Sequence, residues 1–334
     1  MSHEVTSSDL LQFQQLSIEA GNAQINTYAK GTRKNVRSGI RTFVIFCTKF
    51  GRPICPTDRT TLMSFAQLMS LTVGYDHIKN LFSAIKLLHR ALDKKFPEED
   101  FQVETTLKAI KRLLSGTPFQ TLPITPEILT KMYLFIDIHD PEQLANWCSF
   151  LTGFRCLLRK SNLVPTTLPN FDPQTGLSRS KIFIPEDKDV ALVYLNWSKT
   201  NQFGNSEFVI PMVADPLQAL DPVFHLRKLF TMCDLPDHLP AFSFIKRGRI
   251  KCVTYTKFTE DLKKLLDKAG YRSKSYSGHS LRRGGASYLY SLGADPLLIQ
   301  ASGDWKSDCY QRYIFLSFEQ RLSAQMKMAT ASSF

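Results

Sequence analysis

The sequence predicts a mainly α-helical protein with one small antiparallel β-sheet, divided into two domains. Helical periodicity runs through residues 32–114. Residues 115–127 contain three prolines and no long apolar face, a composition typical of a linker. Three β-rich segments follow within residues 181–213, and helical patterns then resume. We expect a leader at 1–24, a helical domain at 25–115, a linker at 116–124 and a second domain, holding the sheet, at 125–334.

The first domain is expected to contain four helices. Thr32 is predicted to cap the first helix, and the others are expected at residues 59–70, 76–94 and 104–114. Arg33, Arg37 and Arg41 follow one another at intervals of four residues in the first helix, so they share one face. That stripe is either a solvated surface or a row of phosphate contacts.

The second domain is predicted from its helix caps and its β-rich segments. Thr125, Asp140 and Asp295 each precede a proline, the pattern of a cap followed by a first-turn proline. Strands are expected at residues 181–184, 191–197 and 208–213. Later helices are expected at residues 216–232, 256–269, 280–292, 296–301, 307–315 and, weakly, 317–328.

Composition points to a globular protein with a polyanionic partner. Hydrophobic residues make up 43% and charged residues 22%, which argues against disorder. The chain has 42 Lys and Arg against 30 Asp and Glu, a formal net charge of +12. Such an excess favours nucleic acid as the partner, although a basic surface without a ligand is the alternative.

Several other classes are disfavoured. No apolar stretch is long enough to cross a membrane, and the polar, partly acidic leader resembles neither a signal peptide nor a transit peptide. The seven cysteines are scattered and form no CxxC pair, which disfavours a disulfide framework or a zinc site and fits a reducing compartment. Nucleotide-binding glycine motifs and metal-binding HExxH are absent, so we expect neither a cofactor nor a metal.

The segment of residues 277–317 carries the most specific chemical pattern. His279 and Arg282 lie three residues apart at the start of a predicted helix, so they share a face. Free backbone N–H groups at a helix start favour an anion, and a guanidinium can bind two phosphate oxygens at once. Trp305 follows a Gly-Asp turn, and Tyr313 lies eight residues beyond it.

This pattern resembles the tyrosine recombinases, the phage-integrase superfamily that includes Cre recombinase and the bacterial Xer proteins. The phrase HSLRRGGAS…GDWKSDCYQRYI is similar in style to recombinases of eukaryotic mobile elements of the Crypton, Ngaro and DIRS types. The resemblance covers about residues 25–320. It implies a SAM-like helical core-binding domain followed by an α+β catalytic domain, whose last helix docks on a neighbouring protomer.

The resemblance also implies a catalytic set. The segment LLRKSNL places the first arginine of the family at Arg159, and WSKTNQFGN places its hairpin lysine at Lys199. The H-x-x-R pair corresponds to His279 and Arg282. Trp305 stands at the later His/Trp position, and Tyr313 is the expected nucleophile, with Tyr310 as its nearby competitor.

Two positions depart from the family pattern. Asn162 stands three residues after the first arginine, where many members have an acid, and Asp304 before Trp305 is unusual against bacterial members. Neither departure removes a catalytic group, so an active enzyme is expected.

Other basic residues are weaker candidates for DNA contacts. Lys246, Arg247 and Arg249 lie in the run KRGRIK, which is either a solvated face or a DNA-backbone contact. Arg283, beside Arg282, could touch a flanking phosphate.

The resemblance implies a site-specific DNA recombinase or integrase of a mobile element. It would cut and rejoin double-stranded DNA through a 3′-phosphotyrosyl intermediate, and would act as a homo-oligomer, a tetramer on DNA. The expected location is the nucleus in a eukaryotic host, and otherwise the cytoplasm with the DNA. Two alternatives remain: a type IB topoisomerase-like enzyme that relaxes DNA, and a non-catalytic DNA-binding protein derived from a mobile element.

Overall fold

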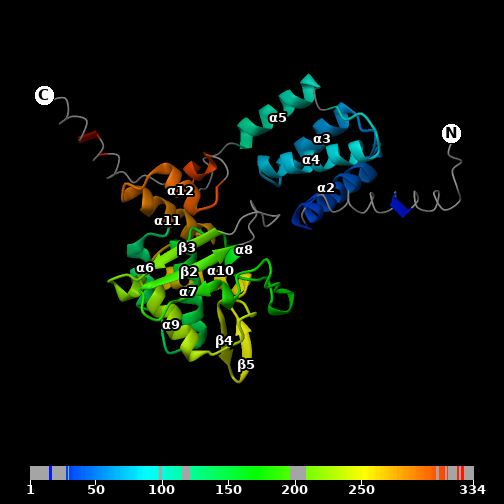
Figure 1. The fold of residues 1–334 in the computed structure, drawn as a ribbon. Coiled ribbons are helices and arrows are strands. Elements are labelled where there is room, and N and C mark those ends of the chain that lie inside the picture. Colours follow the sequence, from blue (N-terminus) through cyan, green and yellow to red (C-terminus); the bar gives the residue numbers. More distant parts are fainter. Residues whose placement is uncertain are drawn as a thin grey trace, which may run out of the picture. The chain divides into compact units, whose positions relative to one another are not determined.

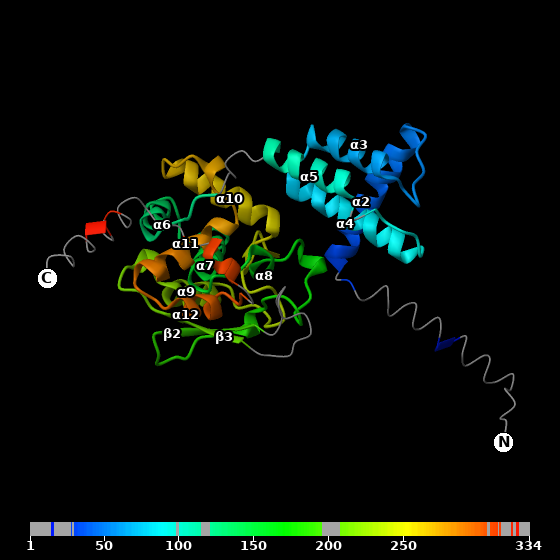
Figure 2. The ribbon, with the colours of Figure 1, turned by 90° about the horizontal axis from the view of Figure 1, so that it is seen from above.

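The structure is a computed structural model that describes residues 15–16, 28, 30–97, 100–114, 121–195, 208–305, 308–312, 314, 322 and 325–326. The chain divides into two compact units, Met1–Phe119 and Gln120–Phe334. Helices build the described part of unit 1, whereas unit 2 combines helices with two small antiparallel sheets (Figures 1 and 2). The predicted fold class is therefore confirmed.

Unit 1 has a core of phenylalanines between its helices. The ring centroids of Phe43 and Phe65 lie 5.1 Å apart, edge to face. Gly39 allows two helices to approach closely, because a Cβ there would lie 2.8 Å from the Cβ of Ala84. Thr32 does not cap the first helix as predicted, because that helix already begins at Lys30. The residues around Thr32 are exposed, so no packing signal in the sequence marks the boundary. The helices are α2 (Lys30–Lys49), α3 (Arg59–Ser70), α4 (Tyr75–Ala91) and α5 (Phe101–Leu114).

Unit 2 is organised around one central helix, α7 (Pro141–Arg155). Every residue from Leu144 to Phe154 is buried, which matches the absence of charge along that stretch of sequence. A helix that is apolar on all sides must be covered on all sides, and α7 packs against α9, α11 and a β-hairpin. The three helix starts predicted from a cap residue followed by proline are confirmed, because Thr125, Asp140 and Asp295 each accept a hydrogen bond from a first-turn N–H. The other helices are α6 (Pro126–Tyr133), α8 (Lys160–Leu163), α9 (Pro222–Met232), α10 (Tyr255–Lys268), α11 (His279–Ser291) and α12 (Pro296–Ser302).

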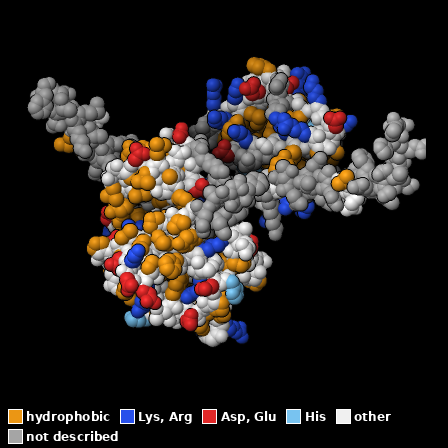
Figure 3. All heavy atoms as spheres, in the orientation of Figure 1, with side chains coloured by type: hydrophobic (Ala, Val, Ile, Leu, Met, Phe, Trp, Pro, Cys, Tyr) orange, Lys and Arg blue, Asp and Glu red, His pale blue; other side chains and the backbone are white. Residues whose placement is uncertain are grey.

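The predicted three-stranded sheet is present. Strands β1 (Ile182–Phe183), β2 (Val190–Leu195) and β3 (Phe208–Val213) pair in that order, all antiparallel. Alternate residues of β2 face the core, whereas Val209 and Val213 of β3 are exposed, on a face where Figure 3 shows many apolar side chains. The sheet thus has one buried face and one apolar, exposed face.

A second sheet was not predicted. Strands β4 (Ser243–Lys246) and β5 (Arg249–Cys252) form a hairpin across the basic run KRGRIK. Its two-residue turn has a positive φ at both Arg247 and Gly248, a turn whose twist matches that of the flanking strands. The dense charge of this segment hides the short strand alternation.

Five short 3₁₀ turns complete the described elements. The helix expected to start at residue 216 begins only at Pro222, after a separate turn, because Asp221 caps it. The helix expected at residues 307–315 is a 3₁₀ turn at Asp308–Arg312, and the one expected at 317–328 lies mostly outside the described residues. The turns are η1 (Leu168–Asn170), η2 (Arg179–Lys181), η3 (Gln218–Leu220), η4 (Ser273–Ser275) and η5 (Asp308–Arg312).

Two consecutive glycines set the position of α11. A Cβ on Gly284 would lie 1.8 Å from the carbonyl oxygen of Ile124, and one on Gly285 would lie 2.1 Å from that of Phe154. Only residues without a Cβ allow α11 to cross both backbones at this distance. Close packing here holds the first turn of α11, which carries His279 and Arg282, against the end of α7.

We predict that Gly285→Ala destabilises unit 2. The added methyl would meet backbone that cannot move aside cheaply, at a cost of about 1–3 kcal/mol or more. Urea denaturation followed by near-ultraviolet circular dichroism measures the change. Gly31→Ala, in open space on α2, is the control and should change stability by less than about 1 kcal/mol. Equal effects of the two substitutions would refute the packing argument.

Candidate active site

Arg159 lies in the sharp turn between α7 and α8. The helix α7 ends at Arg155, and Leu157 then adopts a positive φ of 51°, a rare conformation for a bulky residue. Arg159 follows at the N-terminal cap of α8 with its side chain half-buried. Within the described part of the chain no hydrogen bond or ion pair holds its guanidinium, so the cation is available to a ligand.

Arg282 connects three segments that are far apart in the sequence. Its side chain is only 1% exposed. The guanidinium donates hydrogen bonds to the carbonyl oxygens of Leu157 and, at 2.8 Å, of Gly303. Its central carbon lies 3.9 Å from the ring centroid of Trp305, a close cation–π contact. Arg282 thereby joins the α7–α8 turn, α11 and the segment after α12.

Trp305 is held in a small apolar cluster beside Arg282. It packs with Leu157, Ala286, Ile299 and Tyr310, all of them buried. Gly303 is required here, because a Cβ at that position would lie 1.8 Å from a carbon of the indole ring. The ring therefore stacks on the guanidinium and closes one side of the arginine cluster.

His279 is the first residue of α11 and stands at the exposed edge of the cluster. Partial burial of the ring lowers its pKa, and the nearby positive charges of Arg282, Arg159 and Lys160 lower the pKa further. The imidazole is therefore neutral at pH 7 and able to accept a proton. The Lys160 side chain lies against Gly278, so the residue before His279 is next to the segment that carries Arg159.

Tyr310, the competitor for the role of nucleophile, belongs to the interior of the protein. The Tyr310 side chain is buried, with its ring centroid 6.4 Å from that of Trp305, so it serves the apolar cluster. Tyr313 and Lys199 both lie outside the described residues. The structure thus brings together Arg159, His279, Arg282 and Trp305 of the predicted catalytic set.

Comparisons with known proteins agree on one family. No family model matches the chain. A curated protein from Selenomonas ruminantium, described as an integrase/recombinase XerD homolog, is 23% identical over 313 residues, covering 90% of this chain and 86% of that protein. The chain is therefore similar along most of its length to a site-specific integrase/recombinase.

Solved structures of tyrosine recombinases share the fold. The Tn1549 transposon integrase, in complex with transposon right-end DNA, superposes with a TM-score of 0.58 at 17% identity, covering 93% of this chain and 98% of that chain. A lambda integrase dimer bound to a core site gives 0.55 at 14% identity, covering 90% and 94%. The predicted resemblance is thereby confirmed.

The two departures from the tyrosine recombinase pattern lie in short turns. Asn162 is buried beside Arg159, and its backbone N–H donates to the Arg159 carbonyl at 2.8 Å. This backbone bond supports the α8 turn that carries Arg159, whichever side chain stands at position 162, and the asparagine itself has no structural explanation. Asp304 adopts a positive φ of 50°, and Asp is among the residues that tolerate the left-handed region. It completes the turn that presents Trp305.

The predicted DNA-contact residues fall into two groups. Arg33, Arg37 and Arg41 are exposed along α2, and Figure 3 shows Lys and Arg side chains over the visible face of unit 1. Arg247 and Arg249 are exposed at the tip of the β4–β5 hairpin.

Two other members of that set are engaged inside the protein. Lys246 forms an ion pair with Glu142, which also pairs with Lys257. Arg283 is buried and donates to the Thr121 carbonyl at 2.9 Å, so its role is to hold the segment before α6. The phosphate contact proposed for Arg283 stays a prediction, and the structure shows its guanidinium bonded to backbone of its own unit.

Lys160 is a member of the site that sequence reasoning did not select. Its charge lowers the pKa of His279. The sequence signal that could have identified Lys160 is its position directly after Arg159.

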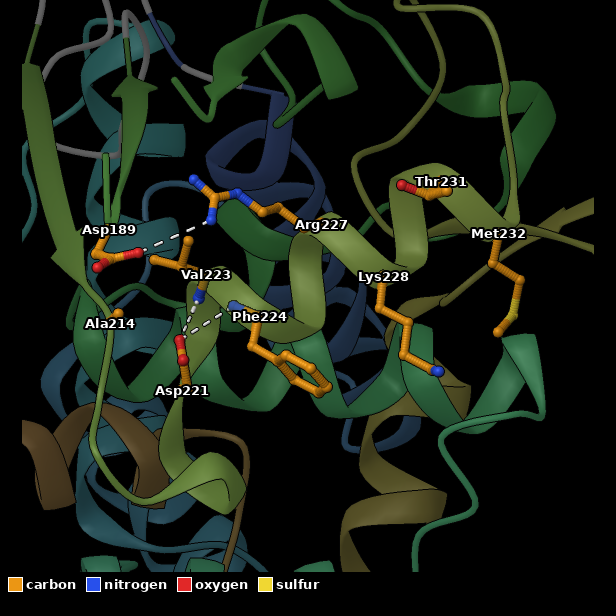
Figure 4. Close-up of a pocket in the computed structure, with 9 residues that line it drawn as sticks. All are labelled: Asp189, Ala214, Asp221, Val223, Phe224, Arg227, Lys228, Thr231 and Met232. Carbon is orange, nitrogen blue, oxygen red and sulfur yellow. Dashed lines mark hydrogen bonds and ion pairs between the residues drawn. The ribbon is translucent and has the colours of Figure 1, made fainter. Parts of the chain in front are cut away.

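A pocket of unit 2 lies away from this site. Figure 4 shows it along α9, lined among others by Asp189, Phe224 and Arg227. None of its lining residues belongs to the catalytic set. No metal-type cluster of His, Cys, Asp and Glu occurs among the described residues, and no described helix is long and apolar enough to cross a membrane.

We predict that His279 titrates below the ordinary histidine value of about 6.5. Proton NMR of the imidazole across pH 4–8, with the urea-unfolded chain as the reference, measures the midpoint. Arg159→Gln removes one neighbouring cation, so the midpoint should move up toward the reference. A wild-type midpoint at or above the reference, or no shift in the variant, would contradict the proximity of these groups.

Proposed function

We propose that this chain is a site-specific DNA recombinase, an integrase of a mobile element, that cuts and rejoins DNA through a covalent tyrosyl intermediate. The observation that carries this proposal is that Arg159, His279 and Arg282 lie in neighbouring segments joined by the Arg282 guanidinium, on which the Trp305 ring stacks. These groups come from three separate segments of a fold shared with recombinases solved on DNA. Converging cations beside a proton acceptor suit phosphoryl transfer.

The cleavage step follows from these groups. The hydroxyl oxygen of Tyr313 attacks the scissile phosphorus, the P–O5′ bond breaks, and a 3′-phosphotyrosyl bond and a free 5′-hydroxyl form. Arg159 and Arg282 stabilise the charge that builds on the non-bridging oxygens. His279 accepts the tyrosyl proton, and Lys199 supplies a proton to the leaving 5′-oxygen. Trp305 packs against Arg282 and closes the site.

Rejoining is the same reaction in reverse. A 5′-hydroxyl from a partner duplex attacks the phosphotyrosine, displaces Tyr313 and restores a phosphodiester. The number and type of bonds is conserved, so the reaction needs no nucleotide hydrolysis. The mechanism uses no cofactor or metal, because the arginines and Lys199 provide positive charge and proton transfer.

Unit 1 is proposed to act as the core-binding domain and unit 2 as the catalytic domain. The relatives solved on DNA support double-stranded DNA as the partner. Exchange between duplexes requires a synaptic tetramer, which we propose is joined through the C-terminal segment of each protomer. A nuclear location in a eukaryotic host belongs to the same proposal.

Covalent trapping tests the nucleophile. Nicked duplexes of randomised sequence lose the cleaved fragment by diffusion, so the phosphotyrosyl complex accumulates and is seen as a denaturation-resistant shift on a gel. Tyr313→Phe should bind DNA and form no covalent complex, because only the attacking oxygen is removed. The matched Tyr310→Phe should retain most of the trapping.

The trapping experiment also separates the alternatives. Trapping lost in Tyr310→Phe and kept in Tyr313→Phe would reverse the assignment. No covalent complex from the wild-type chain would contradict the enzyme and favour a non-catalytic DNA-binding protein. Supercoil relaxation without recombinant joints would favour a topoisomerase.

The salt dependence of DNA binding tests the stripe on α2. Each neutralised phosphate contributes about −0.9 to the slope of log K against log salt concentration, and roughly 6–10 contacts give about −5 to −9. Replacing Arg33, Arg37 and Arg41 by alanine should flatten the slope by up to ~3 units and weaken binding to all sequences alike. Fluorescence anisotropy over a range of salt concentrations measures it. An unchanged slope would identify the stripe as a solvated face.

A further inference from the structure

Lys160 is the first residue of α8, and its side chain extends to another helix. It follows Arg159 directly, yet its side chain ends on α10 rather than at the arginine cluster. The Nζ donates to Oγ1 of Thr259 at 2.6 Å and lies 3.3 Å from the ring centroid of Tyr255. Thr259 Oγ1 donates in turn to the Tyr255 carbonyl at 3.1 Å. The ammonium group is therefore fixed at the first turns of α10.

The stem of Lys160 also contacts the start of α11. A Cβ on Gly278 would lie 3.0 Å from the Lys160 Cδ and 3.3 Å from its Cε, so the stem runs directly over this glycine. Gly278 is the N-terminal cap of α11 and immediately precedes His279. The Lys160 side chain thus lies between α10 and Gly278, the residue directly before His279.

The charge of Lys160 is not neutralised by an acid. Among the described residues it forms no ion pair, and its own pKa is lowered by burial and by the charge of Lys263 on α10. The charged groups that act on His279 are Arg159 and Lys160 from the α8 segment and Arg282 from its own helix. Lys160 thereby contributes to the low proton affinity of the imidazole.

We propose that Lys160 is a positioning residue for strand cleavage, which bridges α8 to α10 across Gly278 and sets the place of His279 relative to Arg159. This role rests on the proposed recombinase function, since a misplaced proton acceptor slows a phosphoryl transfer. Displacement of a positioned group by about 1 Å costs up to roughly 100-fold in rate. Direct contact of Lys160 with the phosphate is not part of the role.

Three variants separate the geometry from the charge. Lys160→Met keeps most of the apolar stem and removes both the charge and the hydrogen bond. Lys160→Arg keeps the charge, and Thr259→Val removes the anchor while leaving the charge. Lys268→Met is the matched control, because it removes an exposed cation from α10 whose charge is not among those that shift the pKa of Lys160 or His279.

The experiment combines trapping rates with NMR on the full chain. Lys160→Met should cleave a trapped duplex about 10- to 100-fold more slowly at pH 7. Its His279 midpoint and the acid limb of its rate profile should move up together. Lys160→Arg should restore most of the rate. Thr259→Val should slow cleavage with a smaller change in the His279 midpoint, and Lys268→Met should match the wild-type chain.

Failure of this inference differs from failure of the proposed function. Wild-type cleavage that Lys160→Met leaves unchanged would overturn the inference alone. A slower Lys160→Met with unchanged His279 titration and pH profile, not rescued by Lys160→Arg, would reduce Lys160 to a general stabilising residue and also overturn it. Absence of cleavage by the wild-type chain would refute the function, and the His279 titration of the free protein would then decide the positioning role by itself.

Discussion

The hydrogen bonds of the buried Arg282 guanidinium are the interaction on which the candidate site in unit 2 depends. A charge that is 1% exposed must be compensated by hydrogen bonds, and Arg282 finds them at the carbonyls of Leu157 and Gly303. Each carbonyl belongs to a turn that leads to a site residue: the α7–α8 turn before Arg159 and the turn before Trp305. One side chain therefore aligns the residues that the proposed reaction requires.

The surrounding packing is arranged to allow this contact. Gly284 and Gly285 let α11 cross the backbones of Ile124 and Phe154, which brings Arg282 within reach of Leu157. The absence of a side chain at Gly303 likewise leaves room for the Trp305 ring, which covers the guanidinium. The left-handed conformations of Leu157 and Asp304 are the local strain that these contacts hold in place.

Sequence reasoning identified the elements with strong local signals. Proline after Thr or Asp marked three helix starts, and β-rich runs marked the three-stranded sheet, because these signals act within a few residues. The arginine and histidine of the site could be named from the family resemblance. The role of Arg283 could not, since only the folded chain shows that Thr121 lies beside it. Lys160 was missed for the same reason: its partner Thr259 is 99 residues away.

Hydrogen exchange in an Arg282→Met variant tests most directly whether this guanidinium holds the site together. The backbone N–H of Trp305 donates to the Gln300 carbonyl at 3.1 Å, so its exchange reports on the turn that Arg282 fixes. The account predicts faster exchange at Gly303–Trp305 and in the Leu157 turn, with the centre of α7 still protected. Unchanged exchange at both turns would contradict it, because the two segments would then be positioned without the arginine.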